Sequence, residues 1–364
     1  MTDRILGVQA LRALAACLVL FSHIHYIEMR DHAEAAVPVF LLYGYSGVDL
    51  FFVISGFVMV LVTRGRLGSK TQAGSFLFSR FARIYPTYWL FCGLAALAFA
   101  FTGSLAVKLE AGNLAASLAL WPSDATMFLG LAWTLVHEMY FYLVFTLFIL
   151  LPGRFLPFLL AGWAAVVLGG QALGAGEARP VIRLIFDPLT LEFIAGAVVG
   201  LLLTSGRRAG AHVALALGLA GLILGMGAIG PEQATTGTAT NWPRTLIFAP
   251  ACALIVYGAV GLELDHGWRA PGWAVRLGDW SYSLYLGHFL VISALSRLWA
   301  PVSASGTLWD NALAAIVMAG ASVMLAWLAF TFFERPVIGA AARLRSRIFA
   351  ARKPEGGRIA SRIW

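Results

Sequence analysis

Long apolar runs separated by short polar stretches are the dominant pattern along the chain. A run of about 20 apolar residues is long enough to cross the hydrocarbon core of a membrane as an α-helix. The pattern therefore predicts an all-α, polytopic integral membrane protein with about ten transmembrane helices. The ten runs cover residues 5–27, 38–63, 85–103, 132–151, 155–172, 184–204, 211–229, 244–262, 279–298 and 310–334.

The basic residues between the runs predict the orientation in the membrane, because Lys and Arg gather on the cytoplasmic side of membrane proteins. With a cytoplasmic N-terminus, 19 of the 26 basic residues fall on the cytoplasmic side, 6 on the far side and Arg12 within the membrane. We therefore expect both termini to be cytoplasmic. A transmembrane domain is expected over residues 1–340 and a basic cytoplasmic tail over residues 341–364.

Composition narrows the class of protein further. The 364-residue chain is 60% hydrophobic and 12% charged, with a mean hydropathy of +0.81, which excludes an ordinary soluble domain. The net charge of +8 follows the membrane orientation, so it does not indicate a nucleic-acid partner. Cys17, Cys92 and Cys252 all lie inside apolar runs, so neither a disulfide framework nor a metal site is expected.

Glycines recur four residues apart at Gly196 and Gly200, and again at Gly221 and Gly225. Small side chains at this spacing let the backbones of two helices approach closely in lipid. We expect helix packing at both pairs rather than a phosphate-binding loop.

The first apolar run carries two ionisable residues at membrane depth, Arg12 and His23. An Arg at the centre of a spanning helix costs about 2.5 to 3.5 kcal/mol on insertion scales, so such residues usually face a protein interior or a wet cavity. Their spacing completes three helical turns, which brings both side chains to one face about 16 Å apart along the axis. One polar stripe is thus expected to link two membrane depths.

Glu138 is expected at the membrane level of His23. In the predicted topology, His23 lies about 6 Å below the outer end of the first helix and Glu138 about 9 Å below the outer end of the fourth. A neutral imidazole oriented by a carboxylate can take a proton from an alcohol, as a general base does. A structural pair of the two residues inside the bundle is the alternative.

Asp49, Tyr285 and His288 are further polar residues in apolar segments. An isolated carboxylate is costly there, so Asp49 is expected to have a partner, either Arg12 or a histidine on a helix. Tyr285 and His288 belong to a segment whose hydroxyl groups and imidazole suit a polar cavity. For these three residues, substrate binding and a structural role both stay open. Ser55 is expected to bond its own helix backbone rather than act as a nucleophile.

Arg80 and Arg83 lie three residues apart, just before the third apolar run. Guanidinium groups form paired hydrogen bonds with phosphate oxygens, so the two residues are candidates for a phosphate clamp. Orientation by positive charge accounts for most loop arginines without any ligand, and it is the alternative here.

Taken together, the ordered motifs resemble acyltransferase family three, membrane proteins that acylate bacterial surface glycans and related acceptors. The resemblance spans almost the whole chain, and the ordered set is specific although each motif is weak by itself. The motifs are Arg12-x10-His23, Gly47-Val-Asp-Leu-Phe-Phe-Val-Ile-Ser-Gly-Phe57, Arg80-x-x-Arg83-Ile-Tyr-Pro86, Trp133-Thr-Leu-x-x-Glu138-x-x-Phe-Tyr142, Ser281-Tyr-Ser-x-Tyr285 and Glu334-Arg-Pro336.

The resemblance implies an O-acyltransferase of the bacterial inner membrane, similar to enzymes that acetylate exopolysaccharide or lipopolysaccharide. It implies an acyl-coenzyme A donor, most simply acetyl-CoA, on the cytoplasmic side, and a glycan or lipid-linked oligosaccharide acceptor reached from outside. Arg12, Arg80 and Arg83 would then hold the donor. His23 would act with Glu138 in catalysis, as a general base or as a transient acyl carrier. No metal and no nucleic acid is implied.

The same polar stripe is compatible with two other classes of protein. A transporter of a glycan or small anion would use the stripe as a pathway without chemistry, and an inert partner of a glycan synthase would use it structurally. Thioester consumption distinguishes the enzyme from the transporter. The acyl group, the acceptor hydroxyl and the oligomeric state stay open.

Overall fold

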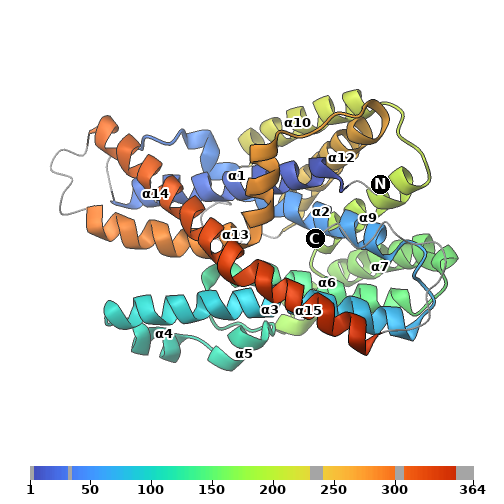
Figure 1. Cartoon of the computed structure of the whole chain (residues 1–364), viewed down its shortest axis with the longest axis horizontal. Coiled ribbons are helices and arrows are strands. Elements are labelled where there is room, and N and C mark those ends of the chain that lie inside the picture. The colour runs from blue at the N-terminus through green and yellow to red at the C-terminus, as the bar shows by residue number, and fades with distance from the viewer. Residues whose placement is uncertain (1–3, 32–34, 230–240, 300–306, 350–364) are drawn as a thin grey trace. The chain divides into compact units, whose positions relative to one another are not determined.

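The computed structural model describes residues 4–31, 35–229, 241–299 and 307–349 (Figure 1). These residues are almost entirely helical, and the β-type contact among them is an isolated bridge between Gly112 and Thr126. The predicted all-α class is confirmed. The chain forms two compact units: unit 1 comprises Met1–Ile5, Phe52–Ala209 and Phe333–Trp364, and unit 2 comprises Leu6–Phe51 and Gly210–Phe332.

Unit 2 combines helices from both ends of the sequence, drawn in blue and in yellow to orange-red in Figure 1. Its first helix begins where the carboxylate of Glu263 accepts hydrogen bonds from the backbone N–H groups of Leu6 and Gly7, at 2.7 and 2.5 Å. A negative side chain stabilises this end of a helix, because its N–H groups have no partner within the helix. The helices are α1 (Leu6–Asp31), η1 (Val39–Ser46), the start of α2 (Gly47–Thr63), α10 (Ala211–Ala228), α12 (Trp242–His266), α13 (Gly272–Trp299) and α14 (Leu308–Ala329).

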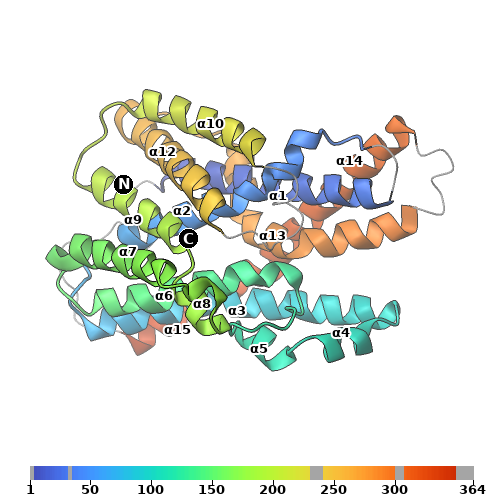
Figure 2. The same cartoon turned by 180° about the vertical axis from the view of Figure 1, so that it is seen from behind.

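Unit 1 holds the middle of the chain and the C-terminal helix, and Figure 2 shows its helices α6, α7 and α8 in green. The expected domain boundary at residue 340 falls inside that C-terminal helix, and residues 350–364 of the expected tail lie outside the described residues. The helices are the rest of α2, α3 (Lys70–Phe101), α4 (Leu105–Ala111), α5 (Leu114–Ala119), η2 (Gly130–Ala132), α6 (Trp133–Ile149), η3 (Gly153–Phe155), α7 (Leu156–Ala172), η4 (Ala175–Glu177), α8 (Pro180–Ile185), α9 (Thr190–Thr204) and α15 (Arg335–Ile348), which the π-turn η5 (Phe330–Glu334) precedes.

Nine helical stretches among the described residues are long and apolar enough to cross a membrane. They match nine of the ten predicted runs. The remaining run, 279–298, lies within α13, which has 28 residues but also carries Arg276, Asp279 and His288. With these residues, α13 is not among the nine stretches. The polytopic membrane fold is thus confirmed.

The helices α1 and α13 run side by side in the same direction. A Cβ atom at Gly278 would overlap the backbone carbonyl oxygen of Gln9, and further along both helices His23 contacts His288. Residue numbers therefore rise together along the two helices. The predicted topology has the first and ninth helices crossing the membrane in the same direction, which agrees with this packing.

The helix packing expected at the glycine pairs is confirmed. In unit 1, Gly196 and Gly200 of α9 face α2, and a Cβ atom at Gly196 would overlap the backbone carbonyl oxygen of Val53. In unit 2, a Cβ atom at Gly225 of α10 would overlap the side chain of Ile247 in α12. Helices in lipid associate through such close van der Waals contact, since lipid chains are as apolar as the side chains they replace.

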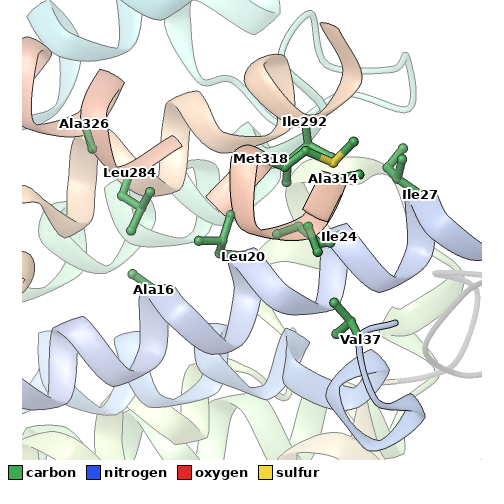
Figure 3. Close-up of a cluster of buried hydrophobic side chains, with 11 residues drawn as sticks. Ala16, Leu20, Ile24, Ile27, Val37, Leu284, Ile292, Ala314, Met318 and Ala326 are labelled. Carbon is green, nitrogen blue, oxygen red and sulfur yellow. The ribbon is translucent and has the colours of Figure 1, made fainter. Parts of the chain in front are cut away.

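A hydrophobic cluster in unit 2 holds α1 against α13 and α14 (Figure 3). Its members on α1 recur every three or four residues and therefore occupy one face of the helix. This face fixes the rotation of α1 about its own axis, and thereby the direction of the polar residues between them. The cluster comprises Ala16, Leu20, Ile24, Ile27, Val37, Leu284, Ile292, Ala314, Ala315, Met318 and Ala326.

The helix α3 begins 15 residues before the predicted start of the third run, at Lys70 rather than residue 85. Ser69 caps it by accepting a hydrogen bond from the Gln72 backbone N–H at 3.4 Å. Its first turns are polar, so hydropathy did not reveal them. Arg80 and Arg83 therefore lie inside a helix and not in a loop.

Candidate active site

Arg12 and His23 both face α13. The Nε atom of Arg12 donates a hydrogen bond to Ser281 Oγ at 3.1 Å, and the His23 ring lies beside His288 with a centroid separation of 5.0 Å. Ser281 and His288 are about two helical turns apart, so they share one face of α13. The two residues of α1 thus form one stripe, as their spacing predicts, and α13 supplies its opposite wall.

The hydrogen bonds of the two histidines assign their protons. His23 Nδ1 lies 2.9 Å from the Val19 carbonyl oxygen and 3.1 Å from His288 Nε2. Because a carbonyl oxygen only accepts, His23 Nδ1 carries the proton and shares it between these acceptors. His288 Nδ1 lies 2.9 Å from the Leu284 carbonyl oxygen, which leaves His288 Nε2 as an acceptor. Neutral His23 assigned in this way keeps a lone pair on Nε2, as a proton acceptor requires.

Aromatic rings surround this histidine pair. Phe289 lies edge-on to His23 at 5.3 Å, and Tyr285 lies 6.0 Å from His288 between ring centroids. Phe51 of α2 packs against Tyr285 in turn, also at 6.0 Å. His288 is buried, whereas His23 is only half-buried. Of the two imidazoles, His23 is therefore the one that a substrate can approach.

Glu138 lies on α6 in unit 1, where hydroxyl groups hold its carboxylate. Ser55 Oγ donates a hydrogen bond to Glu138 Oε1 at 3.3 Å, and the Tyr142 hydroxyl donates a short hydrogen bond to the same oxygen. The prediction that Ser55 bonds its own helix backbone is therefore wrong, because the carboxylate is the acceptor within reach. His23 belongs to unit 2, and its pairing with Glu138 stays a prediction.

Arg80 is buried in α3 beside this carboxylate network. Its guanidinium carbon lies 5.1 Å from the centroid of the Tyr142 ring and 4.9 Å from that of Phe76, which are cation–π distances. A cation so placed retains favourable electrostatic contacts although it is removed from solvent. The aromatic rings also hold its side chain in one orientation.

A polar pocket in unit 1 gathers three guanidinium groups, those of Arg66, Arg80 and Arg345. Ser75 and Ser79 add hydroxyl groups, and Arg345 Nη1 donates a hydrogen bond to Ser79 Oγ at 2.7 Å. No carboxylate stands among the described residues that line it. Three guanidinium groups gathered around one pocket favour an anion, and guanidinium forks suit phosphate oxygens in particular.

Arg83 has a different partner within the same unit. Its Nη1 atom lies 2.9 Å from Oε1 of Glu334, whose side chain is fully buried. A carboxylate without solvent needs an opposite charge, so this pair accounts for both residues structurally. Of the two arginines that were candidates for a phosphate clamp, Arg80 lines the polar pocket and Arg83 neutralises Glu334.

Asp49 is fully buried and paired with Arg244, so neither of its expected partners is correct. Arg244 Nε and Nη2 lie 2.7 and 2.8 Å from the two carboxylate oxygens of Asp49, which makes the contact bidentate. The Arg244 guanidinium also lies 5.1 Å from the ring centroid of Tyr45. Arg12 contacts Ser281 instead, because it faces α13.

Sequence reasoning did not single out Arg66, Arg244 or Arg345. Arg66 and Arg345 lie on the predicted cytoplasmic side, where membrane orientation already explains basic residues. Arg244 is 195 residues from Asp49 in sequence, so no local spacing connects them. The one available signal was the cost of an unpaired Asp49 in an apolar segment, which predicts that a partner exists but does not identify it.

An all-α membrane protein with imidazole, carboxylate and guanidinium groups at membrane depth falls in the class of integral membrane proteins that handle polar substrates within the bilayer. The chain belongs to acyltransferase family three, whose acyltransferase domain matches residues 5–331. Arg12, His23, Arg80, Arg83 and Glu138 all lie within the matched residues. The resemblance drawn from the ordered motifs is confirmed.

Curated relatives cover almost the whole chain. The exopolysaccharide production protein ExoZ of Rhizobium meliloti is 32% identical over 326 residues, which are 85% of this chain and 94% of the relative. The acyltransferase MdmB of Streptomyces mycarofaciens is 28% identical, and nodulation protein 10 of Rhizobium leguminosarum bv. viciae is 27% identical, each over 94% of both chains. No solved structure gave a significant match.

Proposed function

We propose that the protein transfers an acyl group, most simply acetyl, from cytoplasmic acyl-CoA to a hydroxyl group of a bacterial surface or lipid-linked glycan. Membership of the family makes the protein an acyltransferase. The name of the relative ExoZ, an exopolysaccharide production protein, supports a glycan acceptor. The single observation that carries the mechanism is the histidine pair, which leaves the lone pair of His23 on Nε2.

His23 is the general base in this mechanism. Its Nε2 atom takes the proton of the acceptor hydroxyl while the hydroxyl oxygen attacks the carbonyl carbon of the thioester. The ester bond forms as the carbon–sulfur bond breaks, and the imidazolium returns its proton to the departing thiolate of coenzyme A. His288 Nε2 accepts the hydrogen bond from His23 Nδ1–H and so stabilises the imidazolium while it exists.

The donor is proposed to bind with its nucleotide phosphates in the Arg66–Arg80–Arg345 pocket. Arg12 is a separate proposed contact of the donor in unit 2, and about 16 Å separates it from His23 along α1. An extended pantetheine arm has a length of this order. Glu138 is the second catalytic candidate, since two hydroxyl groups orient its carboxylate.

A second route uses the same imidazole as a nucleophile. His23 Nε2 would attack the thioester carbonyl, the carbon–sulfur bond would break, and the proton of His23 Nδ1 would pass to the departing thiolate of coenzyme A. The resulting acyl-imidazole would pass its acyl group to the acceptor oxygen and take up the proton of the acceptor hydroxyl. Rapid acid quenching without acceptor, followed by mass spectrometry of the His23 peptide, distinguishes the routes. The direct route leaves this peptide unmodified.

The test of the proposed function is mass spectrometry of surface glycans from cells with and without the gene. Cells that lack it are expected to lose one acyl mass, 42 Da for acetyl, from a defined sugar position, and the wild-type gene should restore that mass. Purified protein should turn over acyl-CoA repeatedly only when the acceptor is present. Identical glycans together with acceptor flux in vesicles, without thioester consumption, would establish the transporter instead.

The donor pocket makes a separate prediction for Arg80→Gln and Arg345→Gln. Each variant should bind coenzyme A more weakly by about 1.5 to 3 kcal/mol, the usual value of a hydrogen bond to a charged group. This corresponds to a roughly 10- to 150-fold higher dissociation constant. Isothermal titration of purified protein with coenzyme A and with 3′-dephospho-coenzyme A measures the effect.

Arg347→Gln is the matched control, because Arg347 lies two residues further along α15, is exposed and does not line the pocket. Its affinity for coenzyme A should equal that of the wild type. Arg83→Gln should lower stability first, since it strands the buried carboxylate of Glu334. If folded Arg80→Gln and Arg345→Gln bind coenzyme A as tightly as the wild type, the proposal that the phosphates bind in this pocket is wrong.

A further inference from the structure

A second pocket in unit 1 is lined by residues from the start of α6 and from α8, at the opposite end of α6 from the pocket with the three arginines. Figure 2 shows where these two helices lie. Two tryptophan side chains, Trp121 and Trp133, form part of its wall. Trp121 is 60% exposed and Trp133 is half-buried, so aromatic surface is open to the pocket. The catalytic proposal above uses none of these residues.

The pocket also contains an imidazole and a carboxylate, His137 and Asp187. His137 Nε2 lies 3.4 Å from Asp187 Oδ2, and His137 Nδ1 lies 3.0 Å from the backbone carbonyl oxygen of Trp133. Asp187 Oδ1 accepts a hydrogen bond from the backbone N–H of Leu189 at 2.9 Å. Both polar side chains are thus held in place before any ligand binds, and each remains about a tenth exposed.

This combination suits a sugar ring. The C–H groups on one face of a pyranose pack against the electron-rich face of an aromatic ring, and its hydroxyl groups hydrogen-bond to carboxylate and imidazole. An aromatic belt at a membrane interface would explain exposed tryptophans alone. It does not explain a carboxylate and an imidazole held next to each other in the same pocket. A pocket with apolar walls and a few converging polar groups is typical of a small-molecule site.

From this geometry we infer that the pocket binds a sugar residue of the acceptor glycan, with Trp121 and Trp133 against the ring and Asp187 on its hydroxyl groups. The inference rests on the proposed function for the identity of the acceptor. The proposed function does not say which residues recognise that acceptor, and this pocket would supply them. His137 is a positioning residue, since it contacts Asp187 and the Trp133 backbone.

The helix α6 connects this pocket with the groups described above. His137 lines the sugar pocket, the next residue in sequence is Glu138, and Ile149 at the other end of α6 lines the pocket with the three arginines. Twelve residues of helix separate His137 from Ile149, a distance of about 18 Å. The predicted orientation puts the Trp133 end of α6 outside and the Ile149 end in the cytoplasm, which matches acceptor and donor sides.

The experiment uses full-length protein in lipid nanodiscs, since maltoside detergents would themselves present sugar rings. The probe is the set of oligosaccharides released by mild acid from the cell's own surface polysaccharide, after alkali has removed its esters. Saturation-transfer NMR measures binding without donor, and acyl transfer at varied probe concentration measures the KM. Trp121→Ala is expected to raise the dissociation constant and the acceptor KM about tenfold, the factor that 1.4 kcal/mol represents.

Trp121→Phe should restore most of the affinity, because it keeps an aromatic face. Asp187→Asn should raise the acceptor KM with little change in the donor KM. Trp309→Ala is the matched control, since Trp309 is 84% exposed in unit 2, and its KM values should equal those of the wild type. Unchanged probe binding and acceptor KM in folded Trp121→Ala and Asp187→Asn would overturn the sugar pocket.

The two proposals fail in different ways. Probe binding that depends on Trp121, without acyl transfer from any acyl-CoA, would keep the pocket and overturn the proposed function. Acyl transfer whose acceptor KM is indifferent to Trp121 and Asp187 would keep the function and overturn the pocket. No binding of the probe by the wild-type protein would overturn the pocket as well.

Discussion

Alanine in place of His23 is expected to abolish acyl transfer while the protein still inserts and still binds the donor. A positioned general base contributes about 10²- to 10⁴-fold to a rate, so kcat should fall by at least about a hundredfold. The imidazole acts at the reacting end of the donor, and its removal leaves the phosphate contacts in place. Turnover of acyl-CoA at saturating donor and acceptor, with coenzyme A affinity measured in parallel, gives both quantities.

His23→Gln separates chemistry from packing. Glutamine keeps a polar side chain that can donate a hydrogen bond to His288 Nε2, but it has no basic nitrogen. His212→Gln is the matched control, because His212 is an exposed histidine of the same unit on α10, and its kcat should be unchanged. Near-normal turnover of folded His23→Gln would make His23 structural and move the catalytic assignment to Glu138.

Leucine in place of Asp49 is expected to destabilise unit 2 by about 3 to 5 kcal/mol, the usual cost of removing one partner of a buried ion pair. Asp49 is fully buried and binds Arg244 through both carboxylate oxygens, so the variant strands a guanidinium within the helix bundle. Unfolding in mixed micelles, followed by circular dichroism, measures the loss. The activity of the molecules that remain folded should change little, because the expected loss is in the free energy of unfolding.

The double variant Asp49→Leu/Arg244→Met should recover most of this stability, because it removes both charges together. The exposed pair Asp124–Arg183 is the matched comparison: its atoms lie 2.6 Å apart, but its side chains are 71% and 46% exposed. Asp124→Ala should therefore cost less than about 1 kcal/mol. Equal losses at the two sites would show that burial does not decide the contribution of these ion pairs.

Hydropathy predicted the helices well because the cost of exposing a residue to lipid depends mainly on its own side chain. The two departures have the same origin. Polar residues such as Gln72 and Ser75 lie in the first turns of α3, so the hydropathy pattern puts the start of α3 too late. Asp279 lies at the start of the predicted run in α13 and lowers the hydropathy of that run. Gln72, Ser75 and Asp279 are half-buried in the folded protein, by packing that the hydropathy pattern does not contain.

The candidate site was predictable only where its geometry is local. A single helix fixes the relation of Arg12 to His23, and their spacing alone puts both on one face. The pairing of Arg83 with Glu334 spans 251 residues, and its existence depends on how distant helices pack. Residue type indicates that a buried charge needs a partner, whereas the identity of that partner requires the fold.

The contact between Gly278 and Gln9 indicates how the protein could be inactivated without substituting a polar residue. The two backbones meet where only a hydrogen atom fits, near the cytoplasmic ends that the topology predicts for α1 and α13. A larger residue at Gly278 would displace α1 relative to α13. This displacement would change both the contact of Arg12 with Ser281 and the contact of His23 with His288. A designed steric change at Gly278 could therefore give an inactive protein although it lies about 15 Å along α13 from His288 and replaces no polar side chain.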